Sequence, residues 1–198
     1  MNLICLDPEH EYIELTKNLG GTFIDLMSGK YIINVLEPKL WSTGDEEDDD
    51  DIPEAFKKTS LLSQHVSFLK DFLTIEQMDT LELMIMELYE KYEITDMTDV
   101  TLLRHNEFPT LEKLYEHMKD RYHHFDQEEK CLYTEETLRE LCLALNSICI
   151  GADSKFFNGH TNIKEGQFVT FGVKGLLQAN ESIRNAMLFN ILSYMSNE

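Results

Sequence analysis

Apolar residues near the start of the chain form two short alternating runs with a helical pattern between them. They predict a strand at Leu3–Leu6, a helix at Pro8–Asn18 and a second strand at Thr22–Leu26. Asp7 is expected to cap this helix, and the proline that follows it fits the first helical position. Gly20-Gly21 supplies the left-handed stop that ends a helix. Strand, helix and strand in this order indicate one unit of a parallel α/β sheet.

From residue 54 to residue 150 the apolar positions recur every three or four residues, which predicts four helices that pack together. Thr74 and Gln77 form the capping-box pattern that opens the second helix. The third helix is expected to start at Pro109-Thr110, and Thr134 is expected to cap the fourth. The apolar stripes, in chain order, are Leu62, Val66, Leu69 and Leu73; Met78, Leu81, Ile85, Leu88 and Tyr92; Leu111, Leu114, Met118 and Tyr122; and Leu138, Leu141, Leu145 and Ile148.

After Gly151 the pattern returns to strand character at Gln167–Val173, and Asn180 can cap a last helix that runs towards Ser196. The apolar surface of this helix at Ala186–Leu192 is too wide for an exposed helix, so the helix should lie against a sheet. The order of elements therefore predicts an α/β domain that is split by a helical insertion.

Charge narrows the classes of partner, because 37 acidic and 17 basic side chains give a formal net charge of −20. Such a field repels phosphate backbones, and no basic stripe offsets it, so direct nucleic-acid binding is not expected. The acidic run Asp45–Asp51 cannot bury enough apolar surface to order itself and predicts an exposed, flexible linker at 42–53. A calcium site is the alternative, but the run lacks the glycine and the terminal glutamate of a calcium loop.

Neither a secretory signal nor a transmembrane segment is expected, because no basic region precedes the first apolar run and no run approaches about 20 residues. The cysteines are Cys5, Cys131, Cys142 and Cys149. They lie in apolar segments without CxxC spacing, which favours buried free thiols in a reducing compartment. A cytoplasmic location is the expectation that follows.

The candidate site is the acidic segment Asp7, Glu9 and Glu11, where a strand ends and a helix begins. Open α/β sheets place their ligands at this edge, and carboxylates there can accept a proton or order a metal-bound water. Capping is a sufficient structural task for Asp7, so both interpretations stay open for it. Glu9 is the better functional candidate because capping does not require it, whereas Glu11 could equally be a solvated residue of the first turn.

Other chemical motifs are weaker. Ser28-Gly29-Lys30 resembles the end of a phosphate loop, but the earlier glycine and the following Ser or Thr are missing, so a turn is predicted. The spacing of His117, His123, His124 and Cys131 matches no familiar zinc site, so exposed helix histidines are expected and no metal site is predicted. The methionines Met78, Met84 and Met86 could line a binding groove, but helical spacing favours a role in the core.

Several short blocks of sequence, taken together in their order, indicate a protein family far more specifically than any single motif does. The blocks are Leu6–Tyr12, Gly20-Gly21, Ile32–Pro38, Phe156–Gly159 and Ala186–Tyr194. Together they resemble the VirB-type conjugal transfer ATPases of Gram-positive mobile elements, over nearly the whole chain. His10 departs from the pattern, since the family often has glycine at its position.

The resemblance implies an α/β fold with a partial RecA-like sheet of the P-loop NTPase type, interrupted by an all-helical insertion and predominantly helical overall. In the family, the phosphate loop precedes the segment that matches Asp7–Tyr12, and the acidic Walker B strand follows the helix that matches Ile183–Ser196. Asp7, Glu9 and Glu11 match the motif beside the nucleotide site. ATP and magnesium are therefore expected in the complete protein, and this chain alone is expected to bind neither and to be inactive.

The resemblance also implies an oligomeric motor of the hexamer type at the cytoplasmic face of the membrane. Its partners would be channel subunits of a type IV secretion system, a coupling protein or a relaxase. The predicted organisation is a first part of the RecA-like domain at 1–41, the acidic linker at 42–53, the helical insertion at 54–150 and the return to the RecA-like domain at 151–198. A free-standing acidic helical interaction module on an ATPase-derived scaffold remains the alternative.

Overall fold

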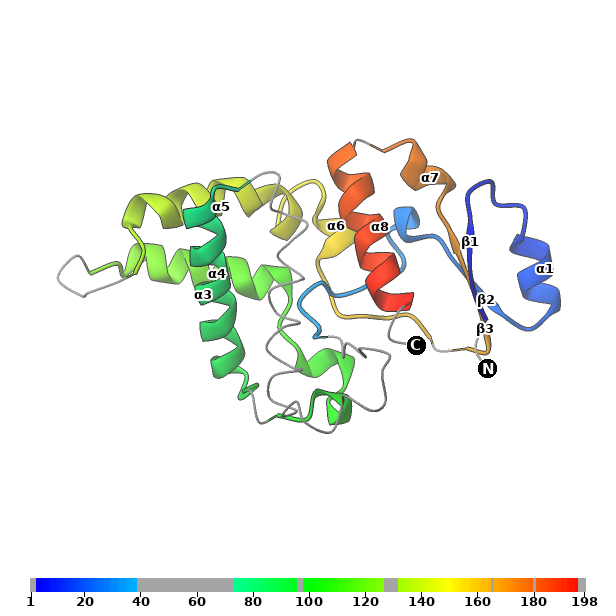
Figure 1. Cartoon of the computed structure of the whole chain (residues 1–198), viewed down its shortest axis with the longest axis horizontal. Helices are drawn as coiled ribbons and strands as arrows, with labels where there is room; N and C mark the ends of the chain where they lie inside the picture. Colours follow the sequence, from blue (N-terminus) through cyan, green and yellow to red (C-terminus); the bar gives the residue numbers. More distant parts are fainter. Residues whose placement is uncertain are drawn as a thin grey trace, which may run out of the picture. The chain divides into compact units, whose positions relative to one another are not determined.

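The computed structural model of the chain describes residues 3–38, 73–95, 98–126, 132–164, 166–179 and 181–195. The chain divides into two compact units, one formed by Met1–Ile33 together with Thr161–Glu198 and the other by Asn34–His160. Both ends of the chain thus contribute to the first unit, as the blue and red ends of the ribbon in Figure 1 show. The predicted linker at 42–53 and most of the first predicted helix of the insertion lie outside the described residues.

In the described part of the first unit, a small parallel sheet consists of β1 (Leu3–Asp7), β2 (Thr22–Ile24) and β3 (Phe168–Gly172). β3 lies between the other two, although it comes from the far end of the chain. It pairs with the whole of β1, so that Leu3 lies opposite Phe168 and Asp7 lies opposite Gly172. The predicted parallel α/β arrangement is therefore confirmed, and the central strand joins the two ends of the sequence.

Helices cover both faces of β3. Thr16 of α1 (Ile13–Asn18) shares a buried hydrogen bond of 2.8 Å between hydroxyl oxygens with Thr170. The neighbouring residue on the strand, Phe171, packs edge-on against Tyr194 of α8 (Glu181–Met195), with ring centroids 5.9 Å apart. Successive strand residues point to opposite faces, so α1 and α8 cover opposite sides of the sheet. The prediction that the apolar last helix lies against a sheet is confirmed.

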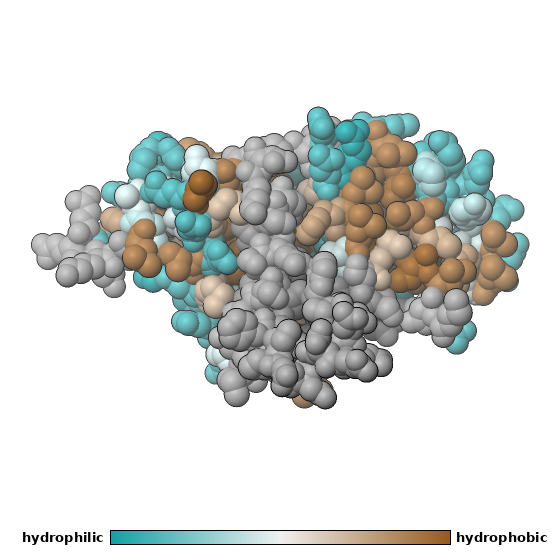
Figure 2. All heavy atoms as spheres, viewed as in Figure 1, coloured by the Kyte–Doolittle hydropathy of each residue, from teal (hydrophilic) through white to brown (hydrophobic). Residues whose placement is uncertain are grey.

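Some apolar surface of this unit remains exposed, as the brown areas over its α8 and β1 side in Figure 2 show. The exposed apolar side chains of the unit include Leu3, Leu19, Leu177 and Leu192. Among the residues that the structure describes, no helix is long and apolar enough to cross a membrane.

Two adjacent glycines after α1 serve different purposes. Gly20 has a φ of +73°, which confirms the predicted left-handed end of the helix. Gly21 is required by space, because a Cβ atom there would lie 2.6 Å from the carbonyl oxygen of Phe168. Only a residue without a side chain lets the chain enter β2 so close to β3.

β2 is shorter than predicted, because Asp25 turns the chain directly after Ile24. The Oδ1 atom of Asp25 accepts a hydrogen bond from the backbone N–H of Met27 at 3.0 Å and starts the 3-10 helix η1 (Leu26–Ser28). Gly29 ends η1 with a φ of +70°. The prediction that Ser28-Gly29-Lys30 is a turn is confirmed.

The second unit is helical in its described residues. Its long helices are α3 (Ile75–Lys91), α4 (Leu111–His123) and α5 (Glu135–Cys149), which pack against one another. The shorter elements are the 3-10 helices η3 (Val100–Leu102) and η4 (His105–Glu107) and the helix α6 (Ser154–Phe157). The predicted packing of the last three helices of the insertion is therefore confirmed.

The starts of α3 and α5 follow from local capping. Thr74 Oγ1 accepts from the backbone N–H of Gln77 at 3.3 Å, and Gln77 Oε1 accepts from the backbone N–H of Thr74 at 3.0 Å. This reciprocal pair is the predicted capping box, an arrangement whose loss typically costs about 1 kcal/mol. Thr134 Oγ1 accepts from the backbone N–H of Thr137 at 3.1 Å and caps α5, as predicted.

The core of this unit contains most of the predicted apolar stripes. The largest fully buried side chains on the long helices are Leu81, Met84, Leu114, Met118, Leu138 and Leu141. Of the methionines predicted to fill the core, Met84 is fully buried, as predicted. Met78 and Met86 are only half-buried, and Met86 lines an open pocket, so a core role is wrong for Met86. Tyr92 was predicted to continue the stripe of α3, but it is exposed, because α3 ends at Lys91 and the chain then turns through Glu93 at a φ of +59°.

Candidate functional site

The carboxyl ends of the three parallel strands lie at one edge of the sheet. β1 ends at Asp7 and β3 ends at Gly172 directly opposite, and the backbone N–H of Val173 donates to the carbonyl oxygen of Asp7 at 2.9 Å. Ile24 ends β2 beside Phe171. Ligands of open α/β sheets bind outside this edge. The loop after β1 is therefore placed where the sequence predicts a site.

The carboxylate of Asp7 organises this loop. Its Oδ1 atom accepts from the backbone N–H groups of Glu9 and Glu11, each at 3.2 Å, and its Oδ2 atom accepts from that of Tyr12 at 2.8 Å. The side chain is almost fully buried. These bonds fold residues 8–12 around one anion.

The prediction that Asp7 caps a helix starting at Pro8 is wrong. The helix begins at Ile13, after Tyr12, and Asp7 instead binds amides along the intervening loop. His10 has a φ of +61°, which a helix cannot accommodate, and its ring packs edge-on against Phe23 with centroids 5.2 Å apart. This packing holds the loop in a non-helical conformation.

The pKa of Asp7 is lowered. Burial, the largest single effect, acts to raise it, but the backbone N–H donors of Tyr12, Glu11, Glu9 and His10 together outweigh burial. A carboxylate that accepts several backbone N–H groups is stabilised in its charged form. Asp7 is thus a fixed anion whose two oxygens are both engaged by the loop, which suits it to positioning and not to proton transfer.

Glu9 and Glu11 extend from the same loop into solvent. The carboxylate of Glu9 lies 3.5 Å from the ammonium of Lys174, and its side chain is 65% exposed. Glu11 is also exposed. The structure therefore brings Asp7, Glu9 and Glu11 together on one loop, where Asp7 is buried and the side chains of Glu9 and Glu11 are exposed to solvent.

Two neighbours of this loop were not predicted as site residues. Lys174 begins the short helix α7 (Lys174–Leu177) directly after β3, and it places a cation beside Glu9. The Nε2 atom of His10 is buried without a hydrogen-bond partner among the described residues. The position of Lys174 after a predicted strand is a signal that the sequence offers, whereas the burial of His10 depends on Phe23 and Gly172 from other strands.

Histidines of the helical unit separate into two environments. His117 was predicted to be exposed, and this is wrong, because its side chain is only 2% exposed and bonds to Glu87 and Lys91. His123 and His124 are exposed, as predicted. Within the described residues, no cluster of three or more His, Cys, Asp or Glu side chains is arranged to hold a metal ion. Cys131 lies outside those residues.

The cysteines among the described residues are free thiols that differ in how far they are buried. Cys149 is fully buried, and burial, with a smaller effect of Cys142, raises its pKa to about 12. Cys5 and Cys142 are half-buried. The prediction of buried thiols is confirmed in full only for Cys149.

The described residues do not by themselves fit a nucleotide with magnesium. They supply the carboxylates of Glu9 and Glu11 and the ammonium of Lys174 at the sheet edge. Binding a triphosphate also needs a cradle of backbone N–H groups, and Ser28-Gly29-Lys30, which comes nearest in sequence, is a turn at the end of η1.

The fold and the residues at this edge of the sheet define the class of protein. It is an α/β protein with a small parallel sheet, helices on both faces of the sheet and an acidic loop at the carboxyl ends of the strands. No family model matches the chain, and no curated protein matches it. Among solved structures, the chain is similar to VirB4 of Thermoanaerobacter pseudethanolicus, with 26% sequence identity and a TM-score of 0.81.

This similarity covers 99% of the chain and 48% of that VirB4 chain, so the sequence spans about half the length of the protein it resembles. Such a likeness over the whole chain is consistent with an α/β fold of the P-loop type. The resemblance to the VirB-type ATPases that the sequence predicts is thereby confirmed.

Proposed function

We propose that the chain is part of an ATPase motor that energises conjugative transfer of DNA or protein through a type IV secretion system. The observation that carries this proposal is the likeness to VirB4 along 99% of the chain. Because the likeness covers 99% of the chain, it extends through both units and is not limited to one common supersecondary motif.

The sheet belongs, in this proposal, to a RecA-like domain of which the chain supplies a part. Its support is the pairing of β1 and β2 with β3, which joins residues on either side of the helical segment in one parallel sheet. The helical segment is then an insertion between two neighbouring strands. Residues 1–41 and 151–198 would form the RecA-like part, with 42–53 as linker and 54–150 as insertion.

Asp7 acts in this proposal as a positioning residue for the loop after β1, because both of its oxygens accept backbone N–H groups. Glu9 and Glu11 lie beside the nucleotide in the complete motor, since they are the exposed carboxylates of this loop. The chain alone binds no ATP and is inactive, because its described residues include no phosphate cradle.

The assembly follows from the same likeness. The motor forms an oligomer of the hexamer type on the cytoplasmic side of the membrane and works with channel subunits, a coupling protein or a relaxase. The net charge of −20 supports contacts with proteins in preference to direct contacts with nucleic acid.

A second candidate is a non-catalytic, acidic helical interaction module on an ATPase-derived scaffold. The observation that favours it is that Asn34–His160 forms a compact unit with a core of its own. The pairing of β1, β2 and β3 favours the motor, because a module that uses only its helical unit does not require an ordered sheet.

Calorimetric titration of MgATP tests the proposal on this chain and on an extended version that adds the phosphate-loop and Walker B segments of VirB-type ATPases at its two ends. We expect no binding to the chain alone and a Kd in the micromolar range, about −8 kcal/mol, for the extended version. Tight binding by the chain alone would show that it has a phosphate site of its own. Failure of both versions to bind would count against the motor.

Variants of the extended version test the loop residues. Glu9→Gln and Glu11→Gln should keep MgATP binding but lower the turnover by about tenfold or more, a loss of roughly 1.4 kcal/mol or more of transition-state stabilisation. The matched control is Glu112→Gln on α4, which removes the same charge from an exposed position in the other unit. Equal turnover in all three variants would remove Glu9 and Glu11 from the site.

A further inference from the structure

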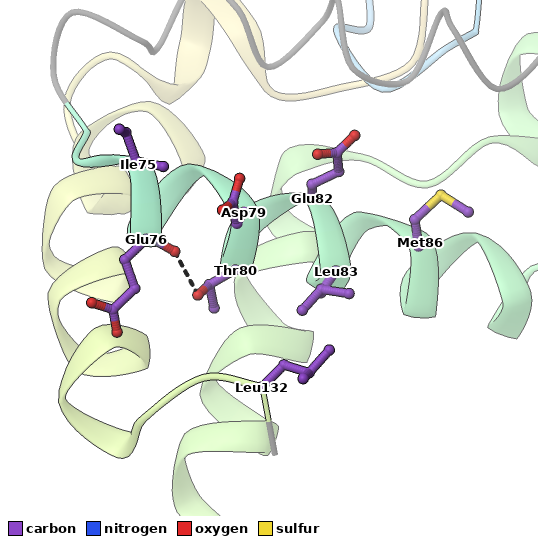
Figure 3. A pocket seen from close by; sticks show the side chains of 8 residues that line it. All are labelled: Ile75, Glu76, Asp79, Thr80, Glu82, Leu83, Met86 and Leu132. Atoms are coloured by element: carbon purple, nitrogen blue, oxygen red, sulfur yellow. Dashed lines mark hydrogen bonds between the residues drawn. The ribbon is translucent and has the colours of Figure 1, made fainter. Parts of the chain in front are cut away.

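An open groove lies beside helix α3 in the helical unit. None of the residues proposed for the ATPase site belongs to this groove. The groove has a volume of about 840 Å³, and Figure 3 shows the side chains that line it. Leu83 of α3 and Leu132, from the segment before α5, point towards each other across it. We call this feature the α3 groove; the lining residues that matter here are Ile75, Asp79, Glu82, Leu83, Met86 and Leu132.

The α3 groove exposes large apolar side chains. Ile75 is 83% exposed and Leu132 is 87% exposed, whereas most aliphatic side chains of α3 lie in the core. A single exposed apolar residue is ordinary, but these two line one groove together with Leu83 and Met86, so the groove presents four large apolar side chains. Covering it would remove apolar area from water, which favours association with another apolar surface.

The rim of the α3 groove is acidic. Glu76, Asp79 and Glu82 line it, and no Lys or Arg is among its described lining residues. Asp79 and Glu82 are exposed, and neither makes an ion pair or a side-chain hydrogen bond with the described residues. Glu76 is held in place, since its Oε1 accepts from the Thr137 hydroxyl at 2.7 Å. Anions without counter-charges beside an apolar strip select a cationic amphipathic partner.

The spacing of the groove residues suits a helix. Ile75, Asp79, Glu82 and Met86 recur every three or four positions and so lie along one line of α3. At 1.5 Å per residue this line is about 17 Å long, roughly three turns of a helix laid beside it. An amphipathic helix that docks in a groove makes contact at this same spacing.

We propose that the α3 groove docks an amphipathic helix of a partner protein, whose leucine-like stripe covers Leu83, Met86 and Leu132 and whose Lys or Arg residues flank that stripe. The flanking cations pair with Asp79 and Glu82. Charge argues against the other occupants, because phosphate backbones and anionic lipid surfaces are repelled by the acidic rim. A second copy of this chain would bring one acidic rim against another.

The test uses a fluorescently labelled helical peptide of about 18 residues, with Leu at i, i+3, i+4 and i+7 and Lys on both sides of this stripe. Anisotropy is measured with the full chain at about 0.15 M salt, where long-range attraction is screened. The variants are Asp79→Lys/Glu82→Lys, which reverses the rim, and Leu132→Ser, which removes the apolar wall at an exposed position. Each should weaken binding by about tenfold or more.

The matched control is Glu14→Lys/Glu112→Lys, which makes the same change in net charge at exposed positions outside the groove. It should change the Kd by less than about twofold. A second peptide of the same composition, with the leucines scattered around the helix, should bind more weakly than the striped one. Circular dichroism of each variant checks that it is folded.

Several outcomes would overturn the proposal. If the control variant weakens binding as much as the rim variant, the net charge of the chain determines peptide binding and the groove does not. If a poly-U oligonucleotide or vesicles of anionic lipid compete with the striped peptide at the groove, the partner class is wrong. If sedimentation shows a dimer of this chain that Leu132→Ser dissociates, the groove is an interface between copies.

Discussion

The side chain of Asp7 connects the end of β1 to the conformation of the whole following loop. Its two oxygens accept three backbone N–H groups, at 2.8 to 3.2 Å, and none of these N–H groups can be satisfied inside the short α1 helix. A buried anion that satisfies several donors is costly to replace, because each donor then loses its partner. The carboxylate therefore has a structural role whether or not a ligand binds nearby.

Asp7→Asn should lower the free energy of unfolding by about 1–3 kcal/mol near neutral pH. The carboxamide keeps only one oxygen acceptor and turns an NH₂ group towards backbone donors. Urea unfolding measures the difference, with Glu11→Gln as the matched control. The control changes an exposed side chain of the same loop and should stay within about 0.5 kcal/mol of the unchanged chain.

The pH dependence of this difference has a defined sign. The folded-state pKa of Asp7 lies below its ordinary value of 3.8, so the charged form stabilises the fold at higher pH. The contribution is fully present above about pH 4 and is lost as the pH falls through the lower, folded-state pKa. The gap between the chain and Asp7→Asn should therefore narrow towards about pH 3. A gap that is constant with pH would contradict the assignment of the charge to Asp7.

Among the elements, α3 and α4 are joined by a polar cluster around the buried ring of His117. Lys91 Nζ donates to His117 Nδ1 at 2.9 Å, so the ring proton lies on Nε2, which donates to Glu87 at 3.0 Å. Arg121 binds the same glutamate with two hydrogen bonds of 2.8 and 2.7 Å. Burial is the largest effect on the pKa of His117 and lowers it, and Lys91 lowers it further. The cluster thus holds a neutral imidazole between the two helices.

His117→Phe should destabilise the helical unit by about 1–3 kcal/mol above pH 7, because the ring volume is kept but Lys91 and Glu87 each lose a partner. The folded-state pKa of His117 is below its ordinary value of 6.5, so its contribution is present above that pH and is lost on acidification. The difference between the variant and the unchanged chain should therefore shrink below about pH 6.5.

Thermal unfolding followed by circular dichroism measures this difference at several pH values. The control is His124→Gln on the same helix, since the side chain of His124 is 77% exposed and its nearest acid, Asp120, is also exposed. It should change stability little at any of these pH values. A His117→Phe difference that grows on acidification would show that the buried imidazole is charged in the folded chain.

For the whole molecule, the most consequential feature is that the sheet is assembled from both ends of the sequence. β3 is the only strand among the described residues that pairs with β1 or with β2, so both depend on it for their hydrogen bonds. The helical unit, by contrast, has its own capped helices and its own buried residues. The two units should therefore respond differently to removal of the C-terminal segment.

A chain shortened to residues 1–160 should keep the helical unit and lose the sheet. Hydrogen exchange should show protection in α3, α4 and α5 but none in β1 and β2, because isolated strands cannot satisfy their backbone groups. The full chain is the control, in which β1 should exchange slowly through its pairing with β3. Loss of protection in α3, α4 and α5 as well would mean that the helical unit does not fold without the sheet.

The starts of the long helices, the strands and the candidate loop could be predicted because their causes are local. Thr74, Thr134 and Gly20 act on residues within a few positions of themselves, and their patterns are readable in the sequence. The placement of Asp7, Glu9 and Glu11 on one loop at the end of β1 follows from their adjacency. Their chemical roles remain predictions, since adjacency does not decide which ligand they meet.

The sequence by itself therefore determined the order of elements, the parallel unit, the capping of α3 and α5 and the acidic loop after β1. Only the tertiary structure decided the start of α1, because the left-handed conformation of His10 depends on Phe23 and Gly172 from two other strands. It also decided that His117 is buried, because its partners Glu87 and Lys91 come from another helix. These features depend on contacts between residues that are distant in sequence, and a local pattern carries no information about such contacts.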